Sequence, residues 1–282
     1  SLALARQIAD AAGIADALLG LAASALGRGD YAAARRCGEE ALAWGESIPR
    51  CKALILDSLG DVAREAGDYA AAWQYARQSL AVCQTLDDRA RLADSLGRLG
   101  NMAYVQGDIA AAEDYYRQDQ ALWEEVGQPM GIARCLNNLG AIAHRRGDYR
   151  RALECYHRSL ELELEAGDRR SMAISWINMA LVAQQLGDGA AAQGYAEQSL
   201  GAFREIGSRW GIAVVLGDLV PIYLQRGEPQ RARAALYEGL AISRDIQAVP
   251  RLLSLLLGAA RLAWQAGCPV RAATWAGTVS SH

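Results

Sequence analysis

The sequence is poor in several residue types, and each shortage excludes a class of protein. Lys52 is the only lysine and no Gly-x-x-x-x-Gly-Lys-Ser/Thr motif occurs, which excludes nucleotide binding of the P-loop kind. No stretch reaches the roughly 18 uninterrupted apolar residues of a membrane helix. The first residues lack a basic region ahead of an apolar core, so no secretory signal is indicated.

Charge and cysteine content exclude further classes. The formal net charge of −3 argues against nucleic-acid binding through bulk electrostatics. The six cysteines include no Cys-x-x-Cys pair, a pattern typical of small apolar residues in a reducing compartment rather than of a metal site. We therefore expect a cytoplasmic protein that uses no metal or cofactor and binds neither nucleic acid nor membranes.

What the sequence has in abundance is a repeat. Seven glycines are separated by 38 residues once and by 40 residues five times. They are Gly29, Gly67, Gly107, Gly147, Gly187, Gly227 and Gly267. Asp follows the glycine in the first five copies. A period of this size indicates a chain built from one structural unit that is repeated.

Each unit reads as two antiparallel helices. Counted from the glycine, the residue eleven places earlier is always large and apolar, and the residue five places later is always Ala. Apolar and small residues at helical spacing precede each glycine, and a second helical pattern follows it. The glycine suits a left-handed position ending the first helix, and the Asp suits an N-cap of the second.

This pattern resembles the tetratricopeptide repeat family. The fourth unit carries it as Leu136, Leu139-Gly140, Ala143, Gly147-Asp148-Tyr149, Ala152, Tyr156 and Ser159-Leu160. The family period is about 34 residues, so these units resemble the longer-repeat branch of kinesin light chains and MalT-like bacterial regulators. The resemblance implies an all-α fold, a right-handed α-solenoid superhelix of about seven helical hairpins.

Domain organisation follows from the repeat. Because a stacked array has no limit on core size, we expect residues 1–282 to form a single solenoid domain. Ser1 aligns with the end of a second helix, and the last second helix is cut short by His282. We therefore expect the chain to be a fragment of a longer multidomain protein.

The resemblance also implies a binding surface. In this family the first helices line a concave groove, and subtracting the packed positions leaves a stripe of side chains free to contact a partner. The stripe consists of Asp57, Asp61, Arg64, Asp94, Arg98, Asn101, Tyr104, Arg134, Asn137, Asn138, His144, Arg145, Asn178, Gln184 and Asp218.

All four asparagines of the protein fall in this stripe. Asn is a poor residue inside a helix because its amide competes for backbone hydrogen bonds, so its placement needs a reason. One reason is recognition of the backbone of an extended peptide, and the resemblance supports it, since long-repeat relatives hold peptide ligands with Asn at positions matching Asn138 and Asn178. The other is that the amides satisfy backbone groups of an adjacent helix. Both remain open.

Two units depart from the pattern. In the third unit, Asp119-Gln120 stands where other units have a small residue followed by Leu, in the packed contact between helices that we call the seam. We expect the helix to rotate so that Ala121-Leu122 fills the seam. The alternative is a polar pocket at this position. In the sixth unit, Pro221 falls inside the first helix and removes the backbone hydrogen bond to Gly217, one turn earlier. A kink is expected there.

These features predict a non-catalytic protein-protein interaction module that binds an extended peptide or protein segment in the groove, as the sensor or scaffold part of a bacterial signalling protein. No catalytic constellation is evident, and we expect no enzyme. One alternative is a small-ligand sensor domain of a MalT-like signal-transduction ATPase. A second is a self-assembling scaffold that stacks head to tail through its truncated ends.

Overall fold

The computed structural model describes residues 10–246, 248, 252 and 255–260 of the chain. Within residues 10–246 every regular element is an α-helix and there is no strand, so the predicted all-α class is confirmed. The helices are α2 (Ala11–Gly27), α3 (Tyr31–Gly45), α4 (Pro49–Glu65), α5 (Tyr69–Gln84), α6 (Arg89–Gln106), α7 (Ile109–Val126), α8 (Pro129–Arg145), α9 (Tyr149–Ala166), α10 (Arg169–Gln185), α11 (Gly189–Glu205), α12 (Arg209–Gln225) and α13 (Pro229–Asp245). The predicted turn at Gly267 and the chain end at His282 lie outside the described residues, as does Ser1.

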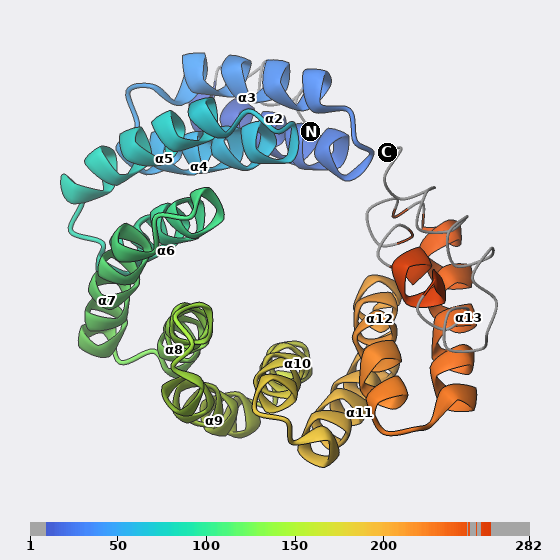
Figure 1. The fold of residues 1–282 in the computed structure, drawn as a ribbon. Coiled ribbons are helices and arrows are strands. Elements are labelled where there is room, and N and C mark those ends of the chain that lie inside the picture. The colour runs from blue at the N-terminus through green and yellow to red at the C-terminus, as the bar shows by residue number, and fades with distance from the viewer. Residues whose placement is uncertain (1–9, 247, 249–251, 253–254, 261–282) are drawn as a thin grey trace. The chain divides into compact units, whose positions relative to one another are not determined.

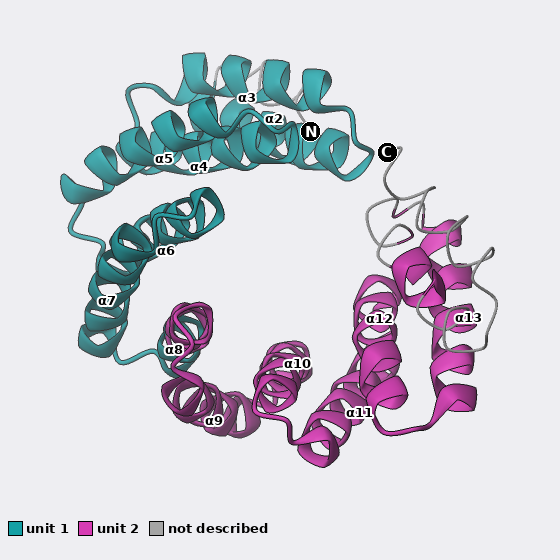
Figure 2. Cartoon of the chain, viewed as in Figure 1, with its two compact units in different colours: residues 1–135 teal, residues 136–282 magenta. Residues whose placement is uncertain are grey.

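The chain divides into two compact units, residues 1–135 and residues 136–282 (Figure 2). In the first unit α2 packs on α3, α4 on α5 and α6 on α7, and successive hairpins meet through α3 with α4 and α5 with α6. In the second unit α10 packs on α11 and α12 on α13, while α9 meets α10 and α11 meets α12. Within each unit the first helices of the hairpins lie on one side and the second helices on the other (Figure 1). Such stacked hairpins are the predicted α-solenoid architecture.

The turns inside the hairpins have the predicted Gly-Asp chemistry. Their glycines have φ angles from 73° to 85°, the left-handed region that strains other residues: Gly29, Gly67, Gly107, Gly147, Gly187 and Gly227. In the first five turns the Asp side chain accepts a hydrogen bond from the backbone N–H three residues later, as Asp148 does from Arg151 at 3.1 Å. The sixth turn has Glu228 without a capping bond and Pro229 in the first turn of α13.

The Ala five places after each turn glycine is fully buried. Its exposed fraction is 0% in every described unit, at Ala34, Ala72, Ala112, Ala152, Ala192 and Ala232. A larger side chain at this position would overpack the interior of the hairpin. The strict repetition of Ala in the sequence is therefore a packing requirement.

The proline of the sixth unit does not interrupt its helix. Pro221 lies inside α12, which continues from Arg209 to Gln225. The kink expected at this point stays a prediction. None of the helices in the described part of the chain is long and apolar enough to cross a membrane.

Candidate binding site

A pocket of about 380 Å³ opens between α4 and α6 in the first unit, and we call it the α4–α6 pocket. Its volume falls within the range of small-ligand sites. The lining residues are Leu56, Asp57, Gly60, Asp61, Arg64, Ala76, Arg98, Asn101, Met102, Tyr104 and Val105. Six of them belong to the stripe predicted from the sequence, namely Asp57, Asp61, Arg64, Arg98, Asn101 and Tyr104. The structure thus brings these six residues together around one opening.

Arg98 of α6 connects the two acidic residues of α4 in this pocket. Its Nη1 donates to Asp61 Oδ2 at 2.8 Å, and its Nε lies 3.8 Å from Asp57 Oδ1. Burial raises the pKa of Asp57, and the charge of Arg98 opposes this only in part. Asp57 Oδ1 is buried, and Ser79 as well as Arg98 favours the charged form of this carboxyl group. The carboxylate of Asp61, whose side chain is 37% exposed, is the acceptor that a bound donor could reach.

The pocket exists because the second repeat has a small residue where the third has a tyrosine. In the third repeat the ring of Tyr116 packs against Gly100, and a Cβ on Gly100 would lie 2.5 Å from Tyr116 Cε1. The residues in the same register of the second repeat, nine places after and seven places before the turn glycine, are Ala76 and Gly60. A Cβ on Gly60 would meet nothing closer than 3.7 Å. The space that a phenol ring fills in one repeat is open in the preceding one.

The other predicted residues of the first unit pair with neighbouring helices. Arg134 Nη2 donates to Asp94 Oδ1 at 2.8 Å, which joins α8 to α6. The Arg134 guanidinium also lies 5.5 Å from the centre of the Trp123 ring, within cation–π range. Asn101 Oδ1 accepts a hydrogen bond from the Tyr116 hydroxyl at 2.8 Å. These contacts hold successive helices together.

Asp119 requires a correction to the sequence analysis. Its side chain is fully buried and Ala121 is exposed, so the predicted helix rotation is wrong and the polar group occupies the seam. Rotation is unnecessary because Gly97 opposite leaves room: a Cβ there would lie 2.6 Å from Asp119 Oδ2. Burial raises the pKa of Asp119 to about 6, although Arg134 Nη2 lies 3.8 Å from Oδ1. The Cys135 thiol and the Trp123 side chain favour the charged carboxylate but offset its burial only in part.

In the second unit, a chain of hydrogen bonds joins α8, α9 and α10. Asn178 Nδ2 donates to Asn137 Oδ1 at 2.9 Å, and Asn137 Nδ2 donates to Ser175 Oγ at 2.8 Å. Ser175 Oγ donates in turn to Glu163 Oε1 at 3.0 Å, which also accepts from Ser159 at 2.8 Å. Burial raises the pKa of Glu163, and the two serine hydroxyls oppose the shift. This network stabilises the stacking of three helices.

The asparagines therefore have structural partners that the sequence did not reveal. Asn101, Asn137 and Asn178 each bond a side chain of another helix rather than a backbone group. Asn138 is half-buried, and its side chain makes no hydrogen bond among the described residues. Ligand binding by any of the four stays a prediction, and Asn138 is the one whose amide is free for it.

The remaining predicted residues of the second unit lie on α8, α10 and α12. His144 packs on Tyr149 with 5.8 Å between ring centres, and burial lowers the pKa of the imidazole, which favours its neutral form. Gln184 Nε2 donates to Gln225 at 3.3 Å, linking α10 to α12. Arg145 is exposed and Asp218 is half-buried.

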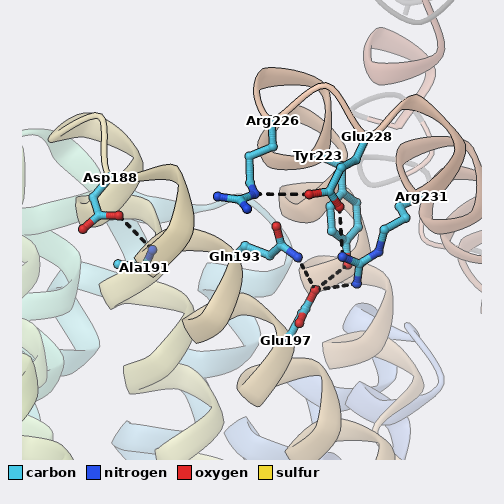
Figure 3. Close-up of polar contacts among 8 residues, drawn as sticks. All are labelled: Asp188, Ala191, Gln193, Glu197, Tyr223, Arg226, Glu228 and Arg231. Atoms are coloured by element: carbon cyan, nitrogen blue, oxygen red, sulfur yellow. Dashed lines mark hydrogen bonds and ion pairs between the residues drawn. The ribbon is translucent and has the colours of Figure 1, made fainter.

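A second polar cluster in this unit was missed by the sequence analysis (Figure 3). Glu197 of α11 accepts hydrogen bonds from Gln193 at 2.8 Å, from the Tyr223 hydroxyl at 3.1 Å and from Arg231 at 2.6 Å. The Arg231 guanidinium lies 4.5 Å from the centre of the Tyr223 ring and donates to Glu228 at 2.9 Å. Burial, followed by the Glu197 charge, raises the pKa of Tyr223 to about 12. These hydrogen bonds join α11, α12 and α13, although Gln193 Oε1 is buried without a partner among the described residues.

Among the described residues no cluster of metal ligands is found, and two of the thiols are held in their protonated form. No group of three or more His, Cys, Asp and Glu side chains among them could hold a metal ion. Burial raises the pKa of Cys135 and of Cys155, which leaves both thiols protonated at neutral pH and poorly nucleophilic.

Sequence reasoning missed five lining residues of the pocket, and Gly60 and Ala76 are the two that account for its opening. The signal was available, because aligning the repeats places the pair Gly60 and Ala76 beside the pair Gly100 and Tyr116. The sequence difference between Ala76 and Tyr116 can be interpreted only from the structure. There Tyr116 packs closely on Gly100, which shows that the second repeat lacks a ring at this place.

Comparison with known proteins supports the repeat assignment. The sequence model of the tetratricopeptide repeat matches residues 13–85, 50–125, 91–165 and 171–245. Among curated proteins, none matches this chain.

Solved structures share the fold. Aspartyl phosphate phosphatase F from Bacillus subtilis is 14% identical with a TM-score of 0.74, over 92% of this chain and 67% of its own. A signal-transduction ATPase with numerous domains and a tetratricopeptide repeat sensor, from Pyrococcus horikoshii, is 17% identical with a TM-score of 0.71, over 95% of this chain and 41% of its own. A Rap protein complexed with Competence and Sporulation Factor is 15% identical with a TM-score of 0.66, over 86% and 78%. At these identities the likeness concerns the fold alone.

Proposed function

Because the chain belongs to the tetratricopeptide repeat family, we propose that it is a non-catalytic interaction module that binds an extended segment of a partner protein on its first-helix face. The observation that carries the proposal is the α4–α6 pocket, which gathers six stripe residues around one opening. Its apolar walls and its acceptor oxygens suit a side chain with both an apolar body and a polar end.

The surroundings of the pocket support a protein partner. Helix faces that present both charges and hydrogen-bonding groups can orient an extended segment, and Asp61, Arg64 and Arg98 provide such groups around the opening. The Rap protein of similar fold is known in complex with Competence and Sporulation Factor, so a chain folded in this way can carry a binding surface.

A display experiment tests the proposal. Peptides of random sequence are selected on the 282-residue chain, and the affinities of the selected peptides are then measured for Asp61→Asn. We expect peptides to be enriched and their affinity to fall about fivefold in the variant, because the amide of Asn keeps an acceptor oxygen but loses the charge that strengthens its hydrogen bonds.

Asp87→Asn is the matched control. Asp87 is also an acidic residue of the first unit, but it is exposed and lies outside the pocket. Its substitution should leave the affinity unchanged. Circular dichroism of both variants checks that the helices remain. Failure to enrich any peptide, or equal loss in both variants, would contradict the proposed site.

A small-ligand sensor is the second candidate function. The volume of about 380 Å³ is large enough for a metabolite, and the similarly folded protein from Pyrococcus horikoshii carries a repeat sensor. A thermal-shift screen with a set of sugars and other metabolites tests this candidate. A compound that raises the melting temperature of the natural chain but not that of Asp61→Asn would favour it.

The cellular setting is also a proposal. We place the chain in the cytoplasm as one continuous repeat array within a bacterial signalling protein, and the free cysteines support a reducing compartment: Cys37, Cys51, Cys83, Cys135 and Cys155. Head-to-tail self-association remains a third candidate, and light scattering over a dilution series tests it. We propose neither nucleic acid nor membrane as a partner, in keeping with the net charge of −3.

A further inference from the structure

We infer that the α4–α6 pocket takes a tyrosine side chain supplied by the partner segment. This inference rests on the proposed function and adds the chemistry of the group that is recognised. It follows from three features of the pocket: its shape, the acceptors at its polar end and the apolar residues of its walls.

The shape comes from an internal precedent. Wherever a tyrosine stands nine places after the turn glycine, a glycine stands opposite it on the first helix. Tyr116 has Gly100, and Tyr156 in the second unit has Gly140, with a hypothetical glycine Cβ 2.5 Å and 2.6 Å from the respective Cε1. Both tyrosines are buried, with exposed fractions of 2% and 1%. In both repeats the space left by the glycine on the first helix fits a phenol ring, and we call this space the slot.

The second repeat has the slot without the ring. Gly60 on α4 matches Gly100 and likewise has no side chain. Ala76 on α5 occupies the position that Tyr116 has in the third repeat. The nearest atoms to a Cβ on Gly60 are 3.7 Å away, the backbone oxygen of Ala72 and the Cβ of Tyr75. A ring entering from outside would occupy the volume that Tyr116 occupies one repeat later.

The polar end of the slot matches a phenol hydroxyl. In the third repeat the Tyr116 hydroxyl donates to Asn101 Oδ1 at 2.8 Å. The residue in the register of Asn101 in the second repeat is Asp61, whose carboxylate accepts from Arg98 and retains further lone pairs. A tyrosine hydroxyl can donate to this carboxylate, whereas phenylalanine and leucine offer it no donor.

The walls fit the same occupant. Leu56, Met102 and Val105 give the pocket apolar surface, and the methionine can adapt to the edge of an aromatic ring. The two carboxylates are balanced by Arg98 and Arg64, so the pocket has no excess charge to attract an ion in place of a neutral phenol. A neutral aromatic group with one donor is the best match for this environment.

The test uses Gly60→Ala and model compounds. N-acetyl-tyrosinamide, N-acetyl-phenylalaninamide and N-acetyl-leucinamide are titrated into the 282-residue chain and followed by saturation-transfer NMR. We expect the tyrosine amide to bind, the phenylalanine amide to bind about tenfold or more weakly, and the leucine amide not to bind. In Gly60→Ala the tyrosine amide signal should be lost, because a methyl group would stand in the path of the ring as a Cβ on Gly100 would stand against Tyr116.

Gly60→Ala should fold, since nothing lies within 3.7 Å of the added carbon. Ala76→Tyr is a second variant that fills the slot from within, and it should abolish the same signal. Equal binding of the tyrosine amide to the natural chain and to both variants would overturn the inference. So would equal binding of the tyrosine and leucine amides.

The peptides from the display selection separate this inference from the proposed function. Enriched peptides that contain tyrosine and lose affinity for Gly60→Ala support both. Enriched peptides without an aromatic residue leave the interaction function standing and overturn the tyrosine slot. Binding of the tyrosine amide with no peptide enriched would assign the pocket to a small phenolic molecule and overturn the partner segment as its source.

Discussion

Tyr116 and Gly100 are in such close contact that Gly100 cannot gain a side chain without displacing the ring: a Cβ on Gly100 would lie 2.5 Å from Cε1 and 2.7 Å from Cδ1 of the ring. The ring cannot swing away without breaking the hydrogen bond from its hydroxyl to Asn101. We expect Gly100→Ala to lower the free energy of unfolding by about 1 to 2 kcal/mol, since overpacking outweighs the better helix propensity of Ala. Urea denaturation followed by circular dichroism measures the change.

The same substitution one repeat earlier should have the opposite sign. Gly60 lies in the same register, and the added methyl group would meet only ordinary contacts at 3.7 Å. We expect Gly60→Ala to raise the free energy of unfolding by about 0.4 to 1 kcal/mol, because Ala restricts the unfolded chain and favours a helix. A destabilised Gly60→Ala would mean that the slot is already filled.

Asp119 should make the stability of the first unit depend on pH. Its pKa of about 6 in the folded chain lies above the ordinary value of 3.8, so the folded state binds the proton more tightly than the unfolded state. Stability from this group is present at low pH and is lost as pH rises towards 6 and above. Relative to Asp119→Ser, the natural chain should lose about 2 kcal/mol between pH 4.5 and pH 8.

Serine is the matched replacement because it occupies this register in neighbouring repeats, at Ser79, Ser159 and Ser199, all fully buried. Denaturant unfolding of both proteins at the two pH values gives the difference, and subtracting the variant removes the titration of all other groups. A difference independent of pH would show that Asp119 remains ionised in the seam.

Ser175 should contribute more to the free energy of unfolding of the second unit than its small side chain suggests. It accepts from Asn137 and donates to Glu163, so Ser175→Ala leaves a half-buried amide and a buried carboxylate each short of one partner. We expect a loss of about 1 to 3 kcal/mol in the free energy of unfolding. Asn138→Ala, which removes no hydrogen bond among the described residues, should change it by no more than about 0.5 kcal/mol. Similar losses for the two variants would count against the network.

The Tyr223 hydroxyl should contribute to the junction of α11, α12 and α13. Tyr223→Phe removes the donor to Glu197 and keeps the ring beneath Arg231, so the expected cost is about 1 to 2 kcal/mol. Tyr237→Phe serves as the control, because Tyr237 on α13 is 65% exposed. Thermal and urea unfolding of the two variants should differ, and a neutral Tyr223→Phe would contradict the role assigned to the hydroxyl.

The repeat fold could be predicted in detail because its rules are local. The glycine φ angles and the Asp caps depend on residues within a few positions of the turn, and the buried Ala five places later is needed in every copy. A single sequence shows these features once the copies are aligned. The prediction failed at Asp119, where the deciding factor was Gly97 on another helix, which makes room for the carboxylate.

The candidate site could be predicted only in part. Helical register placed Asp57, Asp61 and Arg98 on one stripe, and they do meet around a pocket. The bond between Asn137 and Asn178 could not be foreseen, because it depends on the offset between two stacked helices, which no periodicity within one helix determines. The opening of the α4–α6 pocket depends on the absence of a tyrosine at position 76. A pattern of the residues that are present does not reveal such an absence.

The polar pairs between successive first helices have a consequence for how this array could evolve. The apolar seam is nearly the same in every copy, so by itself it would tolerate the loss or exchange of a copy. Arg98 with Asp61, Arg134 with Asp94 and Asn178 with Asn137 are each specific to one junction. A duplication or deletion that preserved the forty-residue period would still bring mismatched partners face to face. The order of the repeats is therefore constrained by these pairs, independently of the sequence motif that the repeats share.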